Sequence, residues 1–343
     1  MIDESVVQNA LKTVKYPGFS RDIVSFGLVK SVQVSGGDVV VQMTLTTAEP
    51  AVAKAIREAS ESAVRAAGAT GGVEIRIDIQ APAQAAGLPG PQGIEGVKHV
   101  IAVASGKGGV GKSTVAANLA LALAAGGARA GLCDCDLYGP SIALMFGANE
   151  RPYADEQERI VPIERHGIKL MSMGFLIDDG SPAVLRGPMV TRYTQQFLRQ
   201  VAWEPLDVLV LDLPPGTGDI QLTIVQTVAL AGAVIVTTPQ EVALIDARKA
   251  IGMFSKTNVR VLGIVENMSY FLCPSDNKKY AIFGEGGGER EAARFGTRLL
   301  GKVPLEIPVR EAGDRGIPVL LGRPESPAAE EFRKIAASIL PEL

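Results

Sequence analysis

Hydrophobic and polar positions change their period along the chain, and the change divides it in two. Over about residues 1–80, Val7, Ala10, Leu11 and Val14 recur at helical spacing, which predicts a short helix with one apolar face. Alternating apolar positions at 39–45 and 73–79 predict strands that bury one face. A turn at 35–38 pairs the first of these with a strand at 28–34, and a second helix is predicted over 51–67. This part is predicted to be a small α+β domain.

From residue 97 to residue 343 the apolar runs are short, nearly continuous and separated by helical stretches. Such runs are typical of parallel strands that are covered on both faces. Their alternation with helices predicts an α/β domain with a doubly wound, mostly parallel sheet. The predicted strands lie at 100–104, 130–134, 168–174, 206–212, 233–238 and 259–267.

The segment 81–96, APAQAAGLPGPQGIEG, has no periodicity and is rich in Ala, Pro and Gly. This composition predicts a flexible linker between the two domains. The uncharged run 220–240 contains Gln, Thr and Pro, so it is predicted to be a helix followed by a strand rather than a membrane span. The C-terminal apolar positions Phe332, Ile335, Ile339 and Leu343 lack a basic face and predict a packed helix instead of a membrane-binding one.

Composition narrows the function classes. The chain has 34 Lys and Arg against 37 Asp and Glu, a net charge of −3, so it lacks the basic character of a nucleic-acid-binding protein. Three cysteines make a disulfide framework improbable, and the acidic start does not resemble a targeting segment. We therefore expect a cytoplasmic protein that binds neither nucleic acid nor membrane.

The strongest motif is a phosphate-binding loop that follows the predicted strand 100–104 and begins a helix. It fits G-x-x-x-x-G-K-[ST], in which backbone N–H groups and the helix N-terminus surround phosphate oxygens. Lys112 is predicted to reach the β- and γ-phosphates of ATP, Ser113 to bind Mg²⁺, and Thr114 to contact the α-phosphate. The nucleotide-binding residues of this loop are Gly106, Lys107, Gly108, Gly109, Val110, Gly111, Lys112, Ser113 and Thr114.

The second lysine of GKGGVGKS, Lys107, resembles the deviant loop of the family that contains the nitrogenase iron protein, the Min and Par ATPases and the Mrp/ApbC iron–sulfur carriers. The resemblance implies that Lys107 reaches the phosphates of a partner protomer in an ATP-dependent homodimer. It also implies that Asp136 positions the attacking water and that Asp134 supports the Mg²⁺ shell. The plainer interpretation of a carboxylate at a strand end is a helix cap.

Two further strand ends resemble the same family. Asp212 begins DLPPGTGD, which is similar to the Walker B and switch II segment, and the resemblance implies that Asp212 holds a Mg²⁺ water. Gly216 would sense the γ-phosphate through its N–H. Asn267 resembles the asparagine that reads adenine. Together with Lys107, Lys112 and Asp136, Asp212 would make the chain a slow, switch-like ATP hydrolase.

Longer strings resemble the Mrp/ApbC branch specifically, and 1–80 resembles the MIP18 (DUF59) type of small domain. These strings are DLYGPSIALMFG at 136–147, LPPGTGDIQLT at 213–223, GIVENMSYFLCP at 263–274 and FGEGGGE at 283–289. The resemblance implies an ATP-dependent carrier of iron–sulfur clusters, with a homodimer, an assembly scaffold and client apoproteins as partners. The alternatives are a cluster-free nucleotide switch and a partition-type ATPase.

One departure from the family concerns its cluster ligands, a C-x-x-C pair in each protomer that holds a bridging [4Fe–4S] cluster. Here the string is Cys273-Pro274-Ser275-Asp276, with Asp276 in place of the second cysteine. Carboxylate is a harder and weaker ligand for such clusters than thiolate. Cys273 is the expected anchor, with Asp276 or an external thiol completing the ligands, and the alternative is a cluster that is bound only transiently. The other pair, Cys133 and Cys135, is expected to be buried beside the nucleotide rather than to bind metal.

Overall fold

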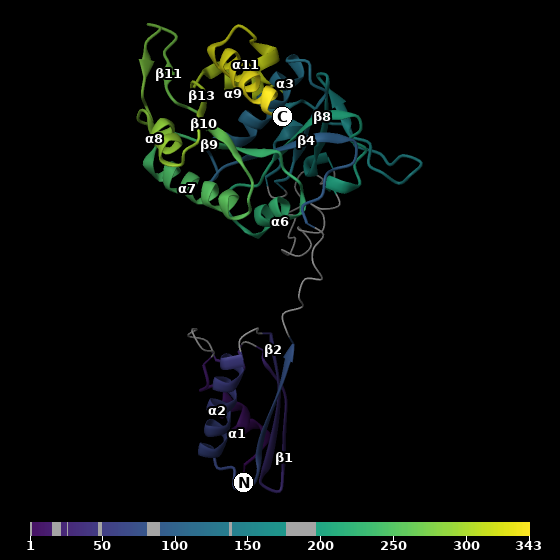
Figure 1. Ribbon diagram of the computed structural model, residues 1–343, viewed down its shortest axis with the longest axis vertical. Helices are drawn as coiled ribbons and strands as arrows, with labels where there is room; N and C mark the ends of the chain where they lie inside the picture. Colours follow the sequence, from purple (N-terminus) through teal and green to yellow (C-terminus); the bar gives the residue numbers. More distant parts are fainter. Residues whose placement is uncertain are drawn as a thin grey trace. The chain divides into compact units, whose positions relative to one another are not determined.

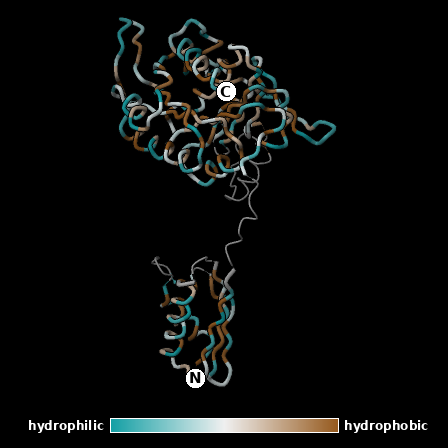
Figure 2. The backbone as a smooth tube through the Cα atoms, in the orientation of Figure 1, coloured by the Kyte–Doolittle hydropathy of each residue, from teal (hydrophilic) through white to brown (hydrophobic). Residues whose placement is uncertain are grey.

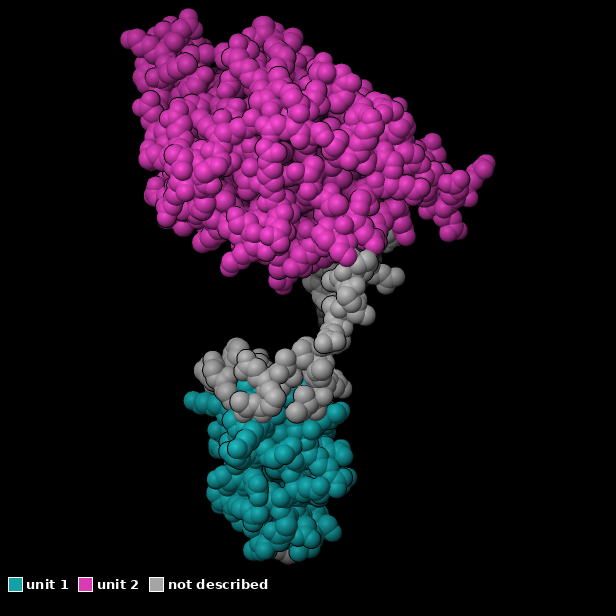
Figure 3. Space-filling model, viewed as in Figure 1, with its two compact units in different colours: residues 1–88 teal, residues 89–343 magenta. Residues whose placement is uncertain are grey.

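The chain forms two compact units, Met1–Leu88 and Pro89–Leu343 (Figure 3). A computed structural model describes residues 2–15, 22–25, 27–46, 50–80, 90–136, 139–175 and 197–343. Residues 81–89 of the predicted linker, and Leu137 and Tyr138 of the string at 136–147, lie outside the described residues. Each unit has its own hydrophobic core.

The smaller unit is a three-stranded sheet with two helices, as the apolar periodicity predicts. Its strands have the order β1-β2-β3, antiparallel between β1 and β2 and parallel between β2 and β3. Val7 and Leu11 of the first helix are fully buried, whereas Val14 is buried beyond the end of that helix. The elements are α1 (Glu4–Leu11), β1 (Val29–Ser35), β2 (Asp38–Thr46), α2 (Pro50–Ala66) and β3 (Val73–Gln80).

The larger unit contains an eight-stranded sheet in the order β13-β10-β9-β4-β8-β5-β7-β6. All neighbours are parallel except β6 and β7, so the predicted doubly wound, mostly parallel α/β fold is confirmed. The strands are β4 (Val97–Ala104), β5 (Ala130–Asp134), β6 (Ile163–Arg165), β7 (Ile168–Ser172), β8 (Leu206–Asp212), β9 (Gly232–Thr237), β10 (Val261–Glu266) and β13 (Leu299–Lys302).

Helices cover both faces of this sheet (Figure 1). One layer contains α3 (Lys112–Ala125), α9 (Ile307–Asp314), α10 (Val319–Gly322) and α11 (Pro327–Ile339). The other contains α6 (Asp219–Thr227), α7 (Glu241–Lys256) and α8 (Gly287–Arg294). A short helix, α4 (Ile142–Met145), follows β5, and a small hairpin of β11 (Phe271–Leu272) and β12 (Lys279–Tyr280) follows β10.

The distribution of hydropathy explains why the sheet is central. Residues of β5, β8 and β9 are buried almost without exception, so these strands have no solvent-facing side. In Figure 2 the hydrophobic colour follows the interior of the larger unit, and hydrophilic segments lie on its outer loops. Among the described residues, none of the helices is both long and apolar enough to span a bilayer.

Several predicted boundaries differ from those of the structure, and two of the differences have identifiable reasons. The strand predicted at 168–174 ends at Ser172 because a 3-10 turn, Met173–Phe175, follows it. The apolar stripe predicted to continue to Leu343 belongs to a helix that ends at Ile339. Pro341 lies two residues beyond, and proline cannot continue a helix.

Candidate functional site

The loop between β4 and α3 lies at the carboxyl edge of the sheet, where ligands of open α/β sheets bind. Gly109 and Gly111 both have φ of 80°, a conformation that favours glycine. A Cβ on Gly106 would lie 2.0 Å from the carbonyl carbon of Asp246 in α7. The loop therefore passes α7 so closely that only glycine fits at position 106.

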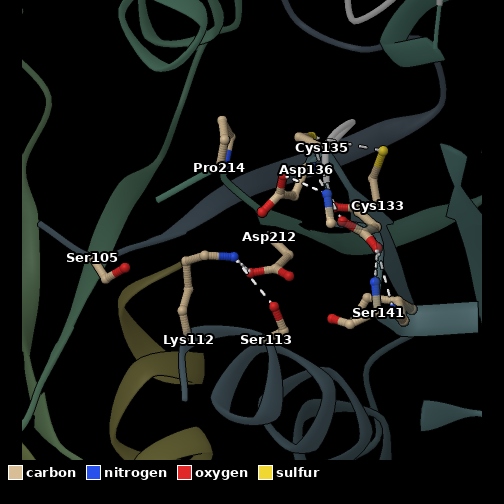
Figure 4. Close-up of polar contacts among 12 residues, drawn as sticks. Ser105, Lys112, Ser113, Cys133, Cys135, Asp136, Ser141, Asp212 and Pro214 are labelled. Atoms are coloured by element: carbon tan, nitrogen blue, oxygen red, sulfur yellow. Dashed lines mark hydrogen bonds and ion pairs between the residues drawn. The ribbon is translucent and has the colours of Figure 1, made fainter. Parts of the chain in front are cut away.

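Lys112 points into the floor of the site and forms a buried ion pair (Figure 4). Its Nζ lies 2.5 Å from Oδ1 of Asp212 and 3.3 Å from Oγ of Ser113. Within the described part of the chain, nothing donates a hydrogen bond to the buried Oδ2 of Asp212. Burial raises the pKa of Asp212, and the Lys112 ammonium opposes that shift. An unsatisfied carboxylate oxygen and a nearby serine hydroxyl are oxygen ligands of the kind that Mg²⁺ prefers, whereas the Lys112 ammonium is suited to an anion.

Asp134 ends β5, in register with Asp212 on β8. Its Oδ2 accepts hydrogen bonds from the N–H groups of Ser141 and Ile142 and from Oγ of Ser172, at 3.0, 3.2 and 3.0 Å. Burial, with the nearby charge of Asp212, raises the pKa of Asp134 to about 7. Asp134 thus holds the start of α4 in place, the arrangement of a helix cap.

Several of the predicted residues line one cavity of about 290 Å³ above the loop. Asp136 lies at its side, opposite the phosphate-binding loop, and its Oδ1 accepts the N–H of Gly139 at 3.2 Å. The cavity is lined by Ser105, Lys107, Gly108, Gly109, Gly111, Lys112, Ser113, Thr114, Asp136, Ser141, Met145 and Pro215. Pro215 comes from the segment whose Gly216 N–H donates to the Ser105 carbonyl at 3.0 Å, which joins this segment to the loop.

A second cavity, of about 310 Å³, shares Thr114 and Met145 with the first. Asn267 lies in its wall, and its Nδ2 donates to the carbonyl oxygen of Val110 at 2.8 Å. Most of the wall comes from α9 and from the segment 304–306 that leads into it, which the sequence did not indicate. The remaining lining residues are Leu144, Met268, Pro304, Leu305, Glu306, Val309, Arg310, Gly313 and Asp314. We call the first cavity the phosphate cavity and the second the base cavity, because a nucleotide bound with its phosphates over the loop would bring its base beside Asn267.

Cys273 and Asp276 do not line either cavity but lie together on the β11–β12 hairpin. The Cys273 thiol is half-buried and lies 3.1 Å from Oγ of Ser275. Asp276 accepts the N–H of Lys278 at 2.9 Å and the hydroxyl of Tyr280 at 2.7 Å. These hydrogen bonds, the backbone one first, lower the pKa of Asp276. The carboxylate is therefore ionised and already has two donors.

The other cysteines are buried next to the phosphate site. The Sγ atoms of Cys133 and Cys135 lie 3.9 Å apart, and hydrogen bonding with Cys133, together with burial, raises the pKa of the Cys135 thiol. A neutral thiol is a poor metal ligand. In the described ranges, His, Cys, Asp and Glu side chains form no group of three or more suited to a metal ion.

Comparisons with known proteins follow the same division of the chain. Residues 96–340 match the family described as "NUBPL iron-transfer P-loop NTPase", and residues 4–77 match "Iron-sulfur cluster assembly protein". The iron-sulfur cluster carrier protein of Synechocystis sp. is 45% identical over 99% of this chain and 97% of its own length. That of Deinococcus radiodurans is 48% identical over 96% of this chain and 93% of its own length.

Solved structures are similar to the larger unit. A nucleotide-binding protein from Archaeoglobus fulgidus in complex with ADP is 38% identical, with a TM-score of 0.59, over 69% of this chain and 92% of its own. The cell division ATPase MinD of Pyrococcus furiosus covers 71% of this chain and 99% of its own at a TM-score of 0.53. Its identity is 22%, so that likeness concerns the fold alone.

Proposed function

This chain belongs to the family of NUBPL-type iron-transfer P-loop NTPases, and we propose that it is an ATP-hydrolysing carrier that binds an iron–sulfur cluster and passes it to apoproteins. Its relatives named iron-sulfur cluster carrier proteins span both of its units. One observation carries the proposal. The half-buried thiol of Cys273 lies on a hairpin whose first strand is bonded to the wall of the base cavity.

Hydrolysis begins with an exchange of partners at Lys112. This ammonium pairs with Asp212 within the protomer, and the β- and γ-phosphates of ATP would replace that carboxylate. Ser113 and the released Asp212 would then hold Mg²⁺, Asp212 through a water molecule. The cation supplies charge neutralisation at the phosphate oxygens. Asp136 orients the water that attacks the γ-phosphorus, and the products are ADP, inorganic phosphate and a proton.

We place Lys107 at a dimer interface. Lys107 lines the phosphate cavity but makes no ion pair in the described part of the chain, whereas Lys112 is already paired within the protomer. In a twofold dimer of the larger units, each Lys107 would add a positive charge to the partner's phosphates. ATP would therefore stabilise the dimer, and hydrolysis would weaken it.

The cluster is the cargo of this carrier. Two protomers supply two thiolates, from Cys273 and its symmetry mate, and a [4Fe–4S] cluster has four iron positions to fill. Asp276 is beside Cys273, but its oxygens already accept hydrogen bonds from Lys278 and Tyr280. Such a cluster would be labile, which suits its release to client apoproteins after loading from an assembly scaffold.

Anaerobic reconstitution with iron and sulfide tests the proposal. The wild-type protein should bind both, and Cys273→Ala should bind neither while retaining ATP binding. Cys133→Ala is the matched control, because it also removes one thiol but a buried one. If wild type bound no iron and sulfide, or Cys273→Ala bound as much as wild type, the chain would instead be a cluster-free nucleotide switch.

A further inference from the structure

A buried carboxylate closes the base of the loop that carries Cys273. Glu266 is the last residue of β10 and has 0% of its surface exposed. Its Oε1 accepts the hydroxyl of Ser269, and its Oε2 accepts the N–H of Gly288, both at 2.5 Å. Ser269 lies near the start of the connection between β10 and α8, which contains the hairpin, and Gly288 lies at its end. The side chain of Glu266 is therefore hydrogen-bonded to both ends of this connection.

The far end of this connection is fixed to the rest of the fold. Gly288 is the second residue of α8, where a carboxylate is favoured by the unpaired N–H groups of the helix. A Cβ at this position would lie 3.0 Å from that of Glu266, so glycine allows the close approach. The buried Glu291 of α8 accepts two hydrogen bonds from Arg248 of α7, at 2.9 and 2.7 Å. The hairpin thus starts and ends on a rigid frame.

The near end of the loop forms part of the base cavity. Asn267 and Met268, directly after Glu266, line that cavity, as does Leu305. The N–H of Leu305 donates to the carbonyl oxygen of Tyr270 at 2.7 Å, and the N–H of Ser269 donates to that of Val303 at 3.0 Å. Cys273 follows Tyr270 by three residues, about 10 Å along an extended strand.

We propose that Glu266 is a positioning residue that couples occupation of the base cavity to the position and accessibility of Cys273. A base in the cavity restrains Asn267, Met268 and Leu305. Glu266 is hydrogen-bonded to both ends of the connection, so a restraint on Asn267 and Met268 also restricts the movement of the hairpin. The inference deepens the proposed function, in which Cys273 anchors the cargo, but the coupling itself is measurable without any cluster.

The chain's three cysteines allow a direct measurement. Cys133 and Cys135 are buried, so iodoacetamide applied to the folded protein reports on Cys273. Magnesium-ADP is the probe, because it carries the base but no γ-phosphate to draw two protomers together. In wild type, saturating ADP should slow the alkylation of Cys273 on the order of fivefold, as for a modest allosteric coupling. An alkylation rate that ADP leaves unchanged would overturn the proposal.

Four variants then isolate Glu266. Glu266→Ala removes both hydrogen bonds and should reduce the ADP effect to less than about twofold, a loss of most of the coupling. Ser269→Ala removes one bond and should weaken the effect by a smaller factor, which keeps the test available if Glu266→Ala does not fold. Glu266→Gln should restore the effect, because its amide oxygen can accept from Gly288 while its NH₂ donates to Ser269. Asp207→Asn, which alters a hydrogen-bonded carboxylate at the start of β8, away from the hairpin and both cavities, should behave as wild type.

ADP affinity, measured by calorimetry, must stay within about threefold of wild type, so that a lost effect is not lost binding. A folded Glu266→Ala or Ser269→Ala protein in which ADP protects Cys273 as fully as in wild type would overturn the role of Glu266. This result is separate from failure of the proposed function. If wild type binds no iron and sulfide, the carrier proposal fails, yet the ADP effect on Cys273 still tests the coupling.

Discussion

The ammonium of Lys112 and the carboxylate of Asp212 form an ion pair 100 residues apart in sequence, with 7% and 0% of their side chains exposed. A buried charge without a partner is costly, so each side chain is stabilised by the other. Phosphate groups of a bound nucleotide would compete with Asp212 for Lys112. Binding of ATP would therefore release a carboxylate, with one oxygen already free of hydrogen bonds from the described residues, toward the cation site.

Lys112→Ala should lower ATP hydrolysis by about 100-fold or more, because phosphoryl transfer depends on charge neutralisation at the phosphates. It should also destabilise the nucleotide-free protein by about 3 kcal/mol, because Asp212 is left buried and unpaired. Phosphate release and urea unfolding measure the two effects. The double variant Lys112→Ala/Asp212→Asn should recover stability but not activity. Turnover near the wild-type rate in either protein would contradict the role of Lys112.

Lys107→Ala should leave ATP binding within about threefold of wild type but weaken hydrolysis and nucleotide-dependent dimerisation. The reason is the proposed role of Lys107, which would act on the partner's phosphates, whereas Lys112 would act within the protomer. Sedimentation with a non-hydrolysable ATP analogue reports the dimer. Lys249→Ala removes an exposed lysine from α7 and is the control. If Lys107→Ala dimerises and hydrolyses ATP as wild type does, the cross-dimer role is wrong.

Asp134 should make stability depend on pH. Its pKa is raised from 3.8 to about 7, so between these values the folded protein keeps a proton that the unfolded chain has lost. The free energy of unfolding should therefore fall as pH rises from about 4 to about 7, by up to about 4 kcal/mol. Asp134→Asn cannot ionise and should lack this component.

Urea unfolding of both proteins at several pH values measures the Asp134 component as the difference between wild type and variant. Subtraction removes the titration of the other carboxylates, which the two proteins share. A difference that stays constant from pH 4 to pH 7 would show that Asp134 is ionised throughout, held so by its hydrogen bonds from Ser141, Ile142 and Ser172.

The fold and the phosphate loop could be predicted because both depend on local sequence. Apolar runs define the parallel strands, and GKGGVGKS contains its own turn glycines and helix start. The base cavity could not be predicted in the same way. Its wall at Pro304 and Leu305 comes from a segment without a motif, brought to Asn267 only by the order of the sheet.

The need of Glu266 for hydrogen-bond donors could have been inferred from the sequence. The strand VLGIVE is buried from Leu262 onward, and a carboxylate at the end of such a strand must find donors. The sequence does not reveal that one donor lies 22 residues away at Gly288. In the same way, Asp212 could be recognised as a site residue, but its pairing with Lys112 depends on the adjacency of β4 and β8.

The part of the predicted linker 81–96 that precedes Gln92 should be the first site of limited proteolysis, because its composition predicts a flexible connection. The prediction was wrong for the end of this segment, because Gln92 forms backbone hydrogen bonds with Thr227 and Ala229 and Ile94 is buried in the core of the larger unit. Cleavage should release a fragment of roughly residues 97–343 that still binds ATP, since both cavities lie within the larger unit. Mass spectrometry of the fragments and a nucleotide-binding assay check this. Resistance of 81–96 under conditions that cut other loops would mean that the two units are firmly docked.

Asp276→Cys should convert the labile cargo site into a more stable one. The substitution restores a C-x-x-C pair and doubles the thiolates that two protomers contribute, and thiolate is the preferred ligand of iron in such clusters. It also removes the carboxylate that accepts hydrogen bonds from Lys278 and Tyr280, so it should slightly destabilise the hairpin. After anaerobic reconstitution, absorbance at roughly 400 nm should persist longer against an iron chelator than in wild type.

Ser275→Cys, which adds a thiol at the wrong spacing, is the control for Asp276→Cys. Equal cluster lifetimes in wild type and Asp276→Cys would mean that position 276 does not face the cargo, and that ligands beyond Cys273 come from outside this hairpin.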